Sequence, residues 1–430
     1  MGDAELLRRH RAVMPSWLTL FYEQPIEIVS GSGRRVTDGG GRQYLDFWGG
    51  ILTNAIGYDI AEIADAVRRQ VDSGVVHTST LYLIRAQVDL AEKIARLSGI
   101  PDAKVFFCNS GSEANDTALT LATNHRGSQQ VLAMRNSYHG RGFGPIAVTG
   151  NRGWSATPLS PFRVAYVEGS YRYRSPYRHL DDDAYIAASV DDLRQTLATA
   201  TSGEIACLLA EPIQGVGGFT SGPDGLLGAL AEVVAEHGGL FVSDEVQTGW
   251  GRTGDHFWGF QAHGVEPDMI TFAKGMGNGL AIGGVVGRGD IMEAVPANSI
   301  STFGGNPLST SAANATIDYL LDHDLQANAA KLGDRLLSGL RDLADAHAVI
   351  GDARGRGLML ALELVVPGGE LPDPAAAAQL LEETRERGLL VGKGGLHGNV
   401  IRMAPPMTLT DEEAGEALDV LSASLAALAG

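Results

Sequence analysis

Primary amines are rare in this sequence. The 430-residue chain contains five lysines: Lys93, Lys104, Lys274, Lys331 and Lys393. Lys274 ends an apolar, strand-like run and precedes the glycine-rich residues 275–279. A lysine at the end of a buried strand loses hydration, which lowers its pKa and favours the neutral amine that attacks carbonyl groups. A lysine at random is more often solvated in a surface loop, but the strand before Lys274 and the glycines after it favour the buried site.

A carboxylate stands in a similar position. Asp244 follows the apolar residues 240–243, and ligands bind parallel sheets at the carboxyl ends of their strands. An aspartate there could keep a pyridine nitrogen protonated, which makes the ring an electron sink. A helix cap or a turn explains the Asp-Glu pair of Asp244 and Glu245 just as well.

A third segment, residues 105–114, runs from a strand through small residues into a helix. Free backbone N–H groups at a helix start form an anion site, and Gly111 permits close approach of a phosphate monoester. Ordinary N-terminal capping by Ser110 and Glu113 is the alternative. A buried amine, a carboxylate and a phosphate loop together suit pyridoxal 5′-phosphate (PLP).

The elements that must position these residues alternate between strand and helix from about 100 to 300. The strand-like runs are residues 105–108, 131–134, 205–210, 240–243 and 269–273. Apolar residues at helical spacing over 226–234 lie between two of them. This alternation predicts an α/β fold with a mostly parallel sheet covered by helices on both faces. The Asp- and Ala-rich residues 181–204 are interpreted as a surface insertion ending in a helix.

The two ends of the chain differ from this middle part. Residues 26–48 predict a hairpin around 38–41, while residues 358–364, 389–391 and 400–403 predict later strands. Thr410 and Glu413 form a capping box that predicts a final helix. We therefore expect an N-terminal segment (1–60) that packs with a small α+β domain (311–430), beside a large α/β domain (61–310).

The formal net charge of −18 makes nucleic acids and anionic membranes improbable partners. The two cysteines, Cys108 and Cys207, lie in separate apolar runs and are interpreted as reduced core residues. No signal-peptide pattern, membrane-spanning run or metal-ligand spacing is seen, so a cytoplasmic location is the default expectation and no metal is expected.

Six motifs resemble, in order, the class III aminotransferases, a family of fold-type-I PLP enzymes. The matching segments are 109–114 (Asn-Ser-Gly-Ser-Glu-Ala), 138–140 (Tyr-His-Gly), 211–215 (Glu-Pro-Ile-Gln-Gly), 244–249 (Asp-Glu-Val-Gln-Thr-Gly), 273–275 (Ala-Lys-Gly) and 302–307 (Thr-Phe-Gly-Gly-Asn-Pro). The resemblance spans nearly the whole chain. It implies a large domain with a seven-stranded, mostly parallel sheet and a smaller α+β domain.

The resemblance also implies roles for individual residues. Lys274 would form the Schiff base with PLP and carry the proton, and Asp244 would pair with the ring nitrogen. The remaining residues expected to bind the cofactor are Ser110, Gly111, Ser112, Tyr138, His139, Glu211, Val246, Gln247 and, from the partner subunit of a homodimer, Thr302. The residues expected to bind substrate are Arg402, which matches the arginine for the α-carboxylate, with Arg141, Trp48 and Tyr82.

Several segments, such as 256–261 and 388–394, are most similar to the alanine–glyoxylate and β-aminoisobutyrate aminotransferases. Ornithine and 4-aminobutyrate aminotransferases have a glutamate at the position of Val216 that can mask the carboxylate-binding arginine. Here Arg402 should stay open, which favours a small 2-oxo acid such as pyruvate or glyoxylate. Arg141 keeps a 4-aminobutyrate/2-oxoglutarate reaction as an alternative, and the residues at 57–61 depart from the family's Gly-His-x-His-Pro.

The expected activity is thus transfer of an amino group from an amino acid, through two half-reactions, to a 2-oxo acid. Aminomutases, racemases and a decarboxylase share this scaffold and remain alternatives.

Overall fold

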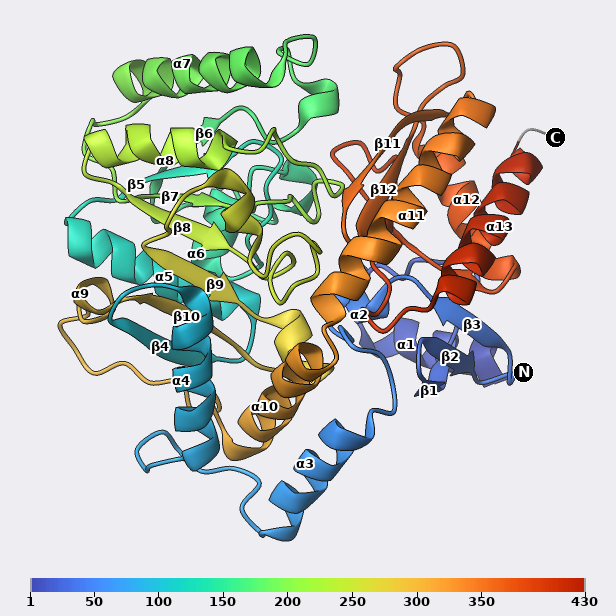
Figure 1. Cartoon of the computed structure of the whole chain (residues 1–430), viewed down its shortest axis with the longest axis horizontal. Helices are drawn as coiled ribbons and strands as arrows, with labels where there is room; N and C mark the ends of the chain where they lie inside the picture. The colour runs from blue at the N-terminus through green and yellow to red at the C-terminus, as the bar shows by residue number, and fades with distance from the viewer. Residues whose placement is uncertain (1, 429–430) are drawn as a thin grey trace.

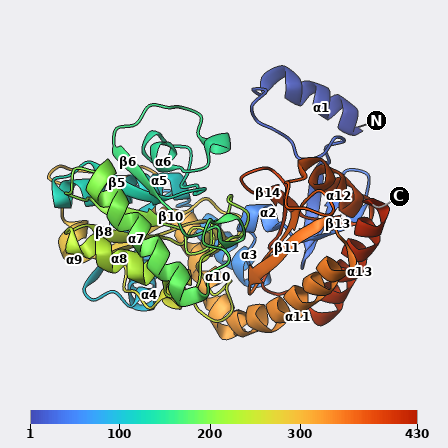
Figure 2. The same ribbon diagram turned by 90° about the horizontal axis from the view of Figure 1, so that it is seen from above.

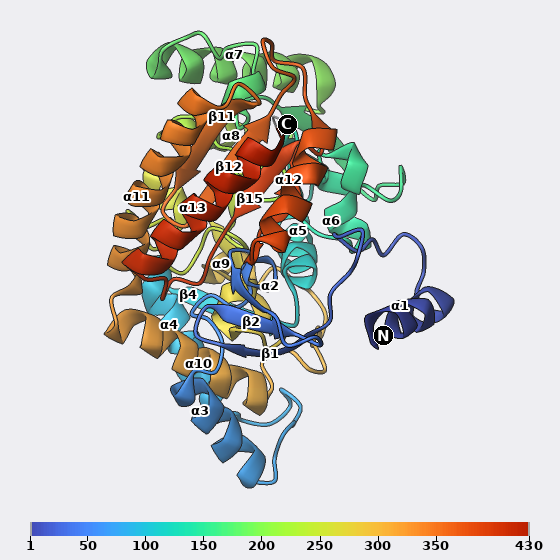
Figure 3. The ribbon, with the colours of Figure 1, turned by 90° about the vertical axis from the view of Figure 1, so that its right-hand side faces the viewer.

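The computed structural model describes residues 2–428 and has a large and a small part, side by side (Figure 1). The large part is built on a seven-stranded sheet, and the small part on two four-stranded sheets. The helix α1 (Gly2–Val13) projects from the body of the molecule (Figures 2 and 3). This architecture confirms the predicted α/β fold with a second, smaller α+β part.

The large sheet has the strand order β4-β10-β9-β8-β7-β5-β6. Its strands are β4 (Ala103–Cys108), β5 (Gln130–Met134), β6 (Arg163–Val167), β7 (Cys207–Ala210), β8 (Leu240–Asp244), β9 (Met269–Phe272) and β10 (Gly283–Arg288). Only β10 runs antiparallel to its neighbours, β4 and β9. The five predicted strands are all present, and β6 and β10 are additions to them.

Helices cover both faces of this sheet (Figure 1). They and their neighbours in the large part are α3 (Ala61–Asp72), α4 (Arg85–Ser98), α5 (Gly111–Arg126), α6 (Phe143–Val148), α7 (Asp182–Ala200), α8 (Leu226–Glu236), α9 (Gly289–Met292) and α10 (Pro307–Asp322). Along β5, Val131 and Ala133 join one apolar cluster, while Leu132 and Met134 join the other. Burial on both faces explains why these strands are continuous apolar runs in the sequence.

The helix expected within residues 181–204 is present, but the interpretation of this stretch as a surface insertion is wrong. Residues 182–200 form α7, which lies between β6 and β7 in the chain and begins directly after the capping residue Asp181. Tyr185, Leu193 and Leu197 point into the core against the sheet and α8. These apolar residues recur at helical spacing, but they are few. The Asp and Ala residues between them make the segment look solvent-exposed in the sequence.

The small part joins the two ends of the chain. One sheet has the order β1-β2-β3-β13 and the other β11-β12-β15-β14. The strands are β1 (Ile28–Ser32), β2 (Arg35–Asp38), β3 (Gln43–Asp46), β11 (Ile350–Arg356), β12 (Met359–Leu364), β13 (Leu389–Leu390), β14 (Gly392–Gly394) and β15 (Val400–Met403). The packed helices are α11 (Leu325–Ala346), α12 (Pro374–Glu386) and α13 (Asp411–Leu428).

Local predictions at both ends are confirmed. The hairpin around 38–41 is β2–β3, where the Asp38 carboxylate accepts the N–H groups of Gly40 and Arg42. Thr410 and Glu413 exchange the capping-box hydrogen bonds that start α13. The predicted boundary at 310 falls within α10, which packs against α3 and α4, so the domain limits stay predictions. Within residues 2–428, every helix is too short or too polar to cross a membrane.

Candidate active site

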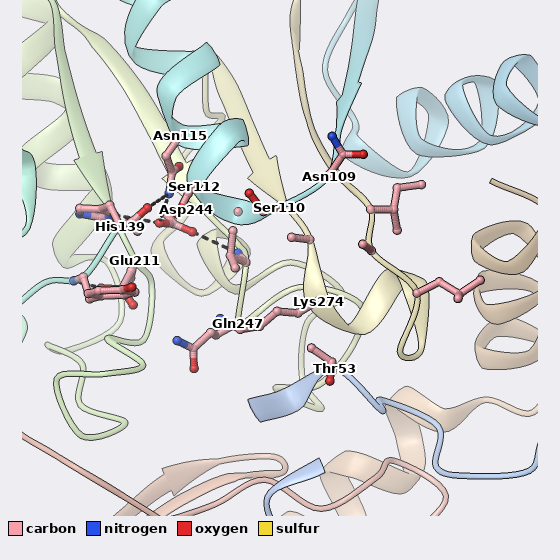
Figure 4. Close-up of a pocket in the computed structure, with 18 of the residues that line it drawn as sticks. Thr53, Asn109, Ser110, Ser112, Asn115, His139, Glu211, Asp244, Gln247 and Lys274 are labelled. Carbon is pink, nitrogen blue, oxygen red and sulfur yellow. Dashed lines mark hydrogen bonds and ion pairs between the residues drawn. The ribbon is translucent and has the colours of Figure 1, made fainter. Parts of the chain in front are cut away.

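A cavity of about 370 Å³ opens at the carboxyl ends of the central parallel strands (Figure 4). Glu211 follows β7, Asp244 ends β8 and Lys274 comes two residues after β9, so three neighbouring strands each supply one ionisable side chain. Parallel strands place their carboxyl ends together, which explains how residues far apart in the sequence line one cavity.

Lys274 is half-buried and faces this cavity. Burial lowers the pKa of its amine from 10.5 to about 8, and the positive charge of Arg402 also lowers it. The negative charges of Asp244 and Glu211 raise this pKa and so partly oppose the effect of burial. Its backbone φ of 47° lies in the left-handed region, which costs a residue other than glycine about 1–3 kcal/mol and is typical of functional sites. The amine is therefore held, with its proton easily lost, at a strained turn.

The Asp244 carboxylate is fixed by three hydrogen bonds. Its Oδ2 accepts from Asn115 Nδ2 and lies 2.8 Å from His139 Nδ1, and its Oδ1 accepts from the Val246 N–H at 3.1 Å. The Asp244 side chain is almost fully buried yet lines the cavity. It can therefore present negative charge to a ligand without reorienting.

The phosphate loop predicted at 109–114 is the start of α5. Ser110 caps the helix by accepting the Glu113 N–H, while the N–H groups of Gly111 and Ser112 belong to the first turn, which has no acceptors of its own. A Cβ on Gly111 would lie 2.9 Å from the methyl groups of Val246, so this approach requires glycine. The helix start thus leaves N–H donors directed at the cavity, as an anion requires.

Glu211 links two sides of the cavity. Its carboxylate accepts the N–H groups of Tyr138 at 2.9 Å and Gly215 at 2.8 Å. Burial raises the pKa of Glu211 from 4.5 to about 7, with His139 opposing and Asp244 reinforcing this change. Gln247 also lines the cavity, and its buried Oε1 has no hydrogen-bond partner within the described chain.

Arg402 lies on β15, an interior strand of its sheet, and its side chain is buried. Its Nη1 and Nη2 donate to the carbonyl groups of Gly215 and Lys393, and Nε has no partner in residues 2–428. The guanidinium lies 4.5 Å from the ring centre of Trp48 and 5.5 Å from that of Phe219. Burial lowers the pKa of Arg402 to about 9.

The predicted cofactor residues other than Thr302 converge on the cavity. The residues that line it are Ser110, Gly111, Ser112, Tyr138, His139, Glu211, Asp244, Val246, Gln247 and Lys274. The exposed Thr302 lies outside this lining, and so do Trp48 and Arg402, which contact each other. Tyr82 is 69 % exposed, and the guanidinium of Arg141 lies over the ring of Trp17. The roles of these outer residues stay predictions.

Sequence reasoning missed other lining residues, including Thr53, Asn109, Asn115 and the 279–282 loop. Asn115 directly follows the recognised 109–114 segment, so that motif was the available signal. Thr53 comes from the N-terminal part of the chain, where no sequence motif indicated a role in the site. In the part of the chain that the structure describes, no group of three or more His, Cys, Asp or Glu residues could hold a metal ion.

Comparison with known families places this geometry in context. The model of the family described as "Aminotransferase class-III" matches residues 22–425. The chain belongs to the class III aminotransferases. A curated relative of this aminotransferase, the mitochondrial alanine–glyoxylate aminotransferase 2 homolog 2 of Arabidopsis thaliana, is 39% identical over 99% of this chain and 87% of its own length.

Solved structures agree with the family assignment of this class III aminotransferase. An amine transaminase from an uncultivated Pseudomonas species, in its PLP-bound form, is 32% identical with a TM-score of 0.89 over 96% of this chain and 98% of that one. A phospholyase from Arthrobacter in complex with phosphoethanolamine is 35% identical with a TM-score of 0.89, covering 98% and 99%. The chain is therefore a PLP-dependent enzyme of fold type I, as predicted.

The site of this aminotransferase fits PLP by its own chemistry. The cavity combines a lysine of lowered pKa, a fixed carboxylate and a helix start with free N–H donors. It also contains a buried amide oxygen, Gln247 Oε1, that lacks a partner, and a buried polar atom without a partner is costly. A ligand with an aldehyde, a ring N–H, a hydroxyl and a phosphate would satisfy all four features.

Proposed function

We propose that this aminotransferase moves an amino group between an amino acid and a small 2-oxo acid such as pyruvate or glyoxylate. The observation that carries the proposal is Arg402, a buried guanidinium without a carboxylate partner in the described chain. A buried charge is costly unless it is paired, so a substrate carboxylate would complete the site. The name of the Arabidopsis relative, which specifies alanine and glyoxylate, supports substrates of this size.

The segment around Arg402 favours carboxylate access. Val216, next to the Gly215 carbonyl that accepts from Arg402, has no charge to neutralise the guanidinium. A Cβ on Gly394 would lie 2.6 Å from Arg402 Nε, so glycine there leaves the guanidinium its room. Trp48 and Phe219 contribute faces that favour a cation and exclude water.

Each residue of the cavity would have a distinct task. PLP, when bound, supplies a ring that withdraws electrons from the substrate α-carbon. Asp244 would hold the proton on the ring nitrogen, and the N–H groups at 110–112 would bind the phosphate. Tyr138 and Val246 would enclose the ring, and Gln247 Oε1 would accept the hydrogen bond of the ring hydroxyl. Lys274 would hold the cofactor through its amine, and the neutral amine would move the proton of the substrate α-carbon.

The decisive experiment is a panel of substrates. Each amino acid is added to the PLP-loaded enzyme, and loss of the cofactor absorption band is measured together with the oxo product. Pyruvate, glyoxylate and 2-oxoglutarate are then compared for restoring the band. We expect pyruvate or glyoxylate to restore it fastest. Preference for 2-oxoglutarate would support the 4-aminobutyrate alternative, and racemisation without oxo product would overturn transamination.

A lysine variant gives the matching control. Lys274→Ala should lower turnover by at least the factor of about 10²–10⁴ typical of proton transfer by a positioned base. Lys331→Ala removes a surface lysine that pairs with Asp411 and should leave turnover unchanged. Normal turnover by Lys274→Ala would rule out the proposed role of this residue.

We also infer that two copies assemble and complete each other's sites. The residues beside Thr302 expose large apolar side chains, with Phe303 at 59 % and, on the neighbouring 77–83 segment, Leu83 at 97 %. The rings of His77 and Phe303 lie 4.7 Å apart, so the two segments form one surface. Apolar surface of this kind usually marks an interface. A second copy there would bring Thr302 to the phosphate loop, which the assembly mass in solution can test.

A further inference from the structure

The two oxygens of the Asp244 carboxylate have different surroundings. Oδ2 has Asn115 Nδ2 at 2.8 Å and His139 Nδ1 at 2.8 Å, so both of its acceptor sites are used. Within residues 2–428, Oδ1 accepts only the N–H of Val246, at 3.1 Å. A carboxylate oxygen accepts about two hydrogen bonds, so Oδ1 keeps one site for a ligand in the cavity that Asp244 lines.

Asn115 is locked in the orientation that produces this asymmetry. Its Nδ2 donates to Asp244 Oδ2 and to the His139 carbonyl, and its Oδ1 accepts from Thr271 Oγ1, all at 2.8 Å. A flipped amide would set its oxygen against two other acceptors. Asn115 is 1 % exposed and Thr271 0 % exposed, so water does not compete for these bonds.

Thr271 also connects this pair to the strand that carries the lysine. It lies on β9, three residues before Lys274, and is opposite Asp244 in the β8–β9 register. Its carbonyl accepts the N–H of Glu245, the residue after Asp244. The backbone and side chain of Thr271 therefore fix the carboxylate relative to the strand that carries the lysine. Asn115 lies on α5, after its phosphate loop, and points toward Asp244 (Figure 4).

We propose that Asn115 and Thr271 form a positioning pair that turns Asp244 Oδ1 toward the cavity and so secures its contact with the ring nitrogen of PLP. Neither residue reacts. The proposal rests on the PLP site proposed above. A residue that only supports packing would affect the binding of any ligand in the cavity, whereas this pair should affect only the contact between Asp244 and the ring nitrogen.

The test compares two cofactors that differ at that atom. Wild type and Asn115→Ala are loaded with PLP or with its 1-deaza analogue, in which a C–H replaces the ring nitrogen, and equilibrium dissociation is measured for both. A buried hydrogen bond to a charged group is worth enough that Asn115→Ala should weaken PLP binding by about 10- to 100-fold. Binding of the 1-deaza analogue should change by less than about 2-fold, because Asp244 has no partner on it.

Three control variants keep the test decisive. Asn124→Ala removes an exposed asparagine of the same helix, whose side chain donates to the Thr120 carbonyl, and this variant should bind both cofactors as wild type does. Thr271→Val removes the hydroxyl and should repeat the PLP-specific loss to a smaller extent, while Thr271→Ser should restore binding. If Asn115→Ala does not fold, the two Thr271 variants decide the question.

Two results would overturn the positioning pair. Equal losses for PLP and the analogue would show a packing role, and unchanged PLP binding would show no role. Both results leave the PLP site itself intact, whereas failure of the wild type to take up PLP would refute the site proposed above.

Discussion

Lys274 and Asp244 line the same cavity from neighbouring parallel strands, β9 and β8. The amine and the carboxylate are thus available to one ligand, and the charge of Asp244 partly offsets the effect of burial on the lysine pKa. Had they faced separate cavities, a Schiff-base cofactor with a protonated ring would have had no site here.

The pKa of Lys274 predicts how capture of the cofactor depends on pH. Burial lowers this pKa to about 8, and only the neutral amine reacts with an aldehyde. In enzyme freed of cofactor, the rate of covalent PLP capture should rise about tenfold per pH unit below this pKa and level off above it. Rapid absorbance measurements after mixing test this, and a rate that still rises steeply up to the ordinary lysine pKa would contradict it. Lys274→Ala provides the baseline.

Glu211 predicts a second pH effect, on stability. Burial raises its pKa from 4.5 to about 7, so the folded chain binds this proton more tightly than the unfolded chain does. The stabilisation is complete below the pKa of Glu211 in the unfolded chain and is lost as the pH rises through its pKa in the folded chain. Glu211→Gln should lose this dependence. Unfolding free energies measured from about pH 5 to about pH 8 check it, and parallel curves for both proteins would refute it.

Arg402 should discriminate substrates by their carboxylate. Arg402→Lys replaces a planar guanidinium, held by two carbonyls and two rings, with a flexible ammonium. We expect kcat/KM for amino acids to fall by about 10- to 100-fold. The rate with a simple primary amine that lacks a carboxylate should change little. Equal losses for both kinds of donor would indicate damage to the cavity rather than loss of carboxylate binding.

Thr302 can be tested by mixing subunits. Lys274→Ala and Thr302→Val should each be impaired alone. If Thr302 acts on the partner's phosphate loop, a mixed dimer contains one site with both native residues, and activity should reappear. Refolding the two variants together and measuring turnover tests this. No recovery, with mixed dimers demonstrated by mass, would mean that Thr302 acts within its own subunit.

The cofactor half of the site was predictable because its residues lie in short strand-to-loop segments that each carry a local pattern. Lys274, Asp244 and the 110–112 loop all follow apolar strands, and one parallel sheet brings them together. The contacts between segments were not predictable. Thr271 and Asn115 are 156 residues apart, and the rings around Arg402 come from the N-terminal part and the 213–220 loop.

The parts of the fold that escaped prediction have the same cause. The Asp- and Ala-rich composition of α7 looks solvated, and only the sheet beneath it shows which side is buried. Nothing in the residues next to Arg402 shows that its strand is flanked by β14 and β12. In both cases the segments that bury the residue are distant in the sequence, so the neighbouring residues do not reveal the burial.

The pairing of β3 with β13 has a consequence for synthesis of the chain. Leu45 is synthesised early, but its strand partner is Leu389. Arg34 likewise donates a hydrogen bond to Glu413, which is synthesised 379 residues later. The first strands to leave the ribosome therefore have an open edge until translation is nearly complete, while the large sheet can already form. During that interval these strands are exposed to wrong pairing, and a chain cut short before residue 389 would keep that edge permanently.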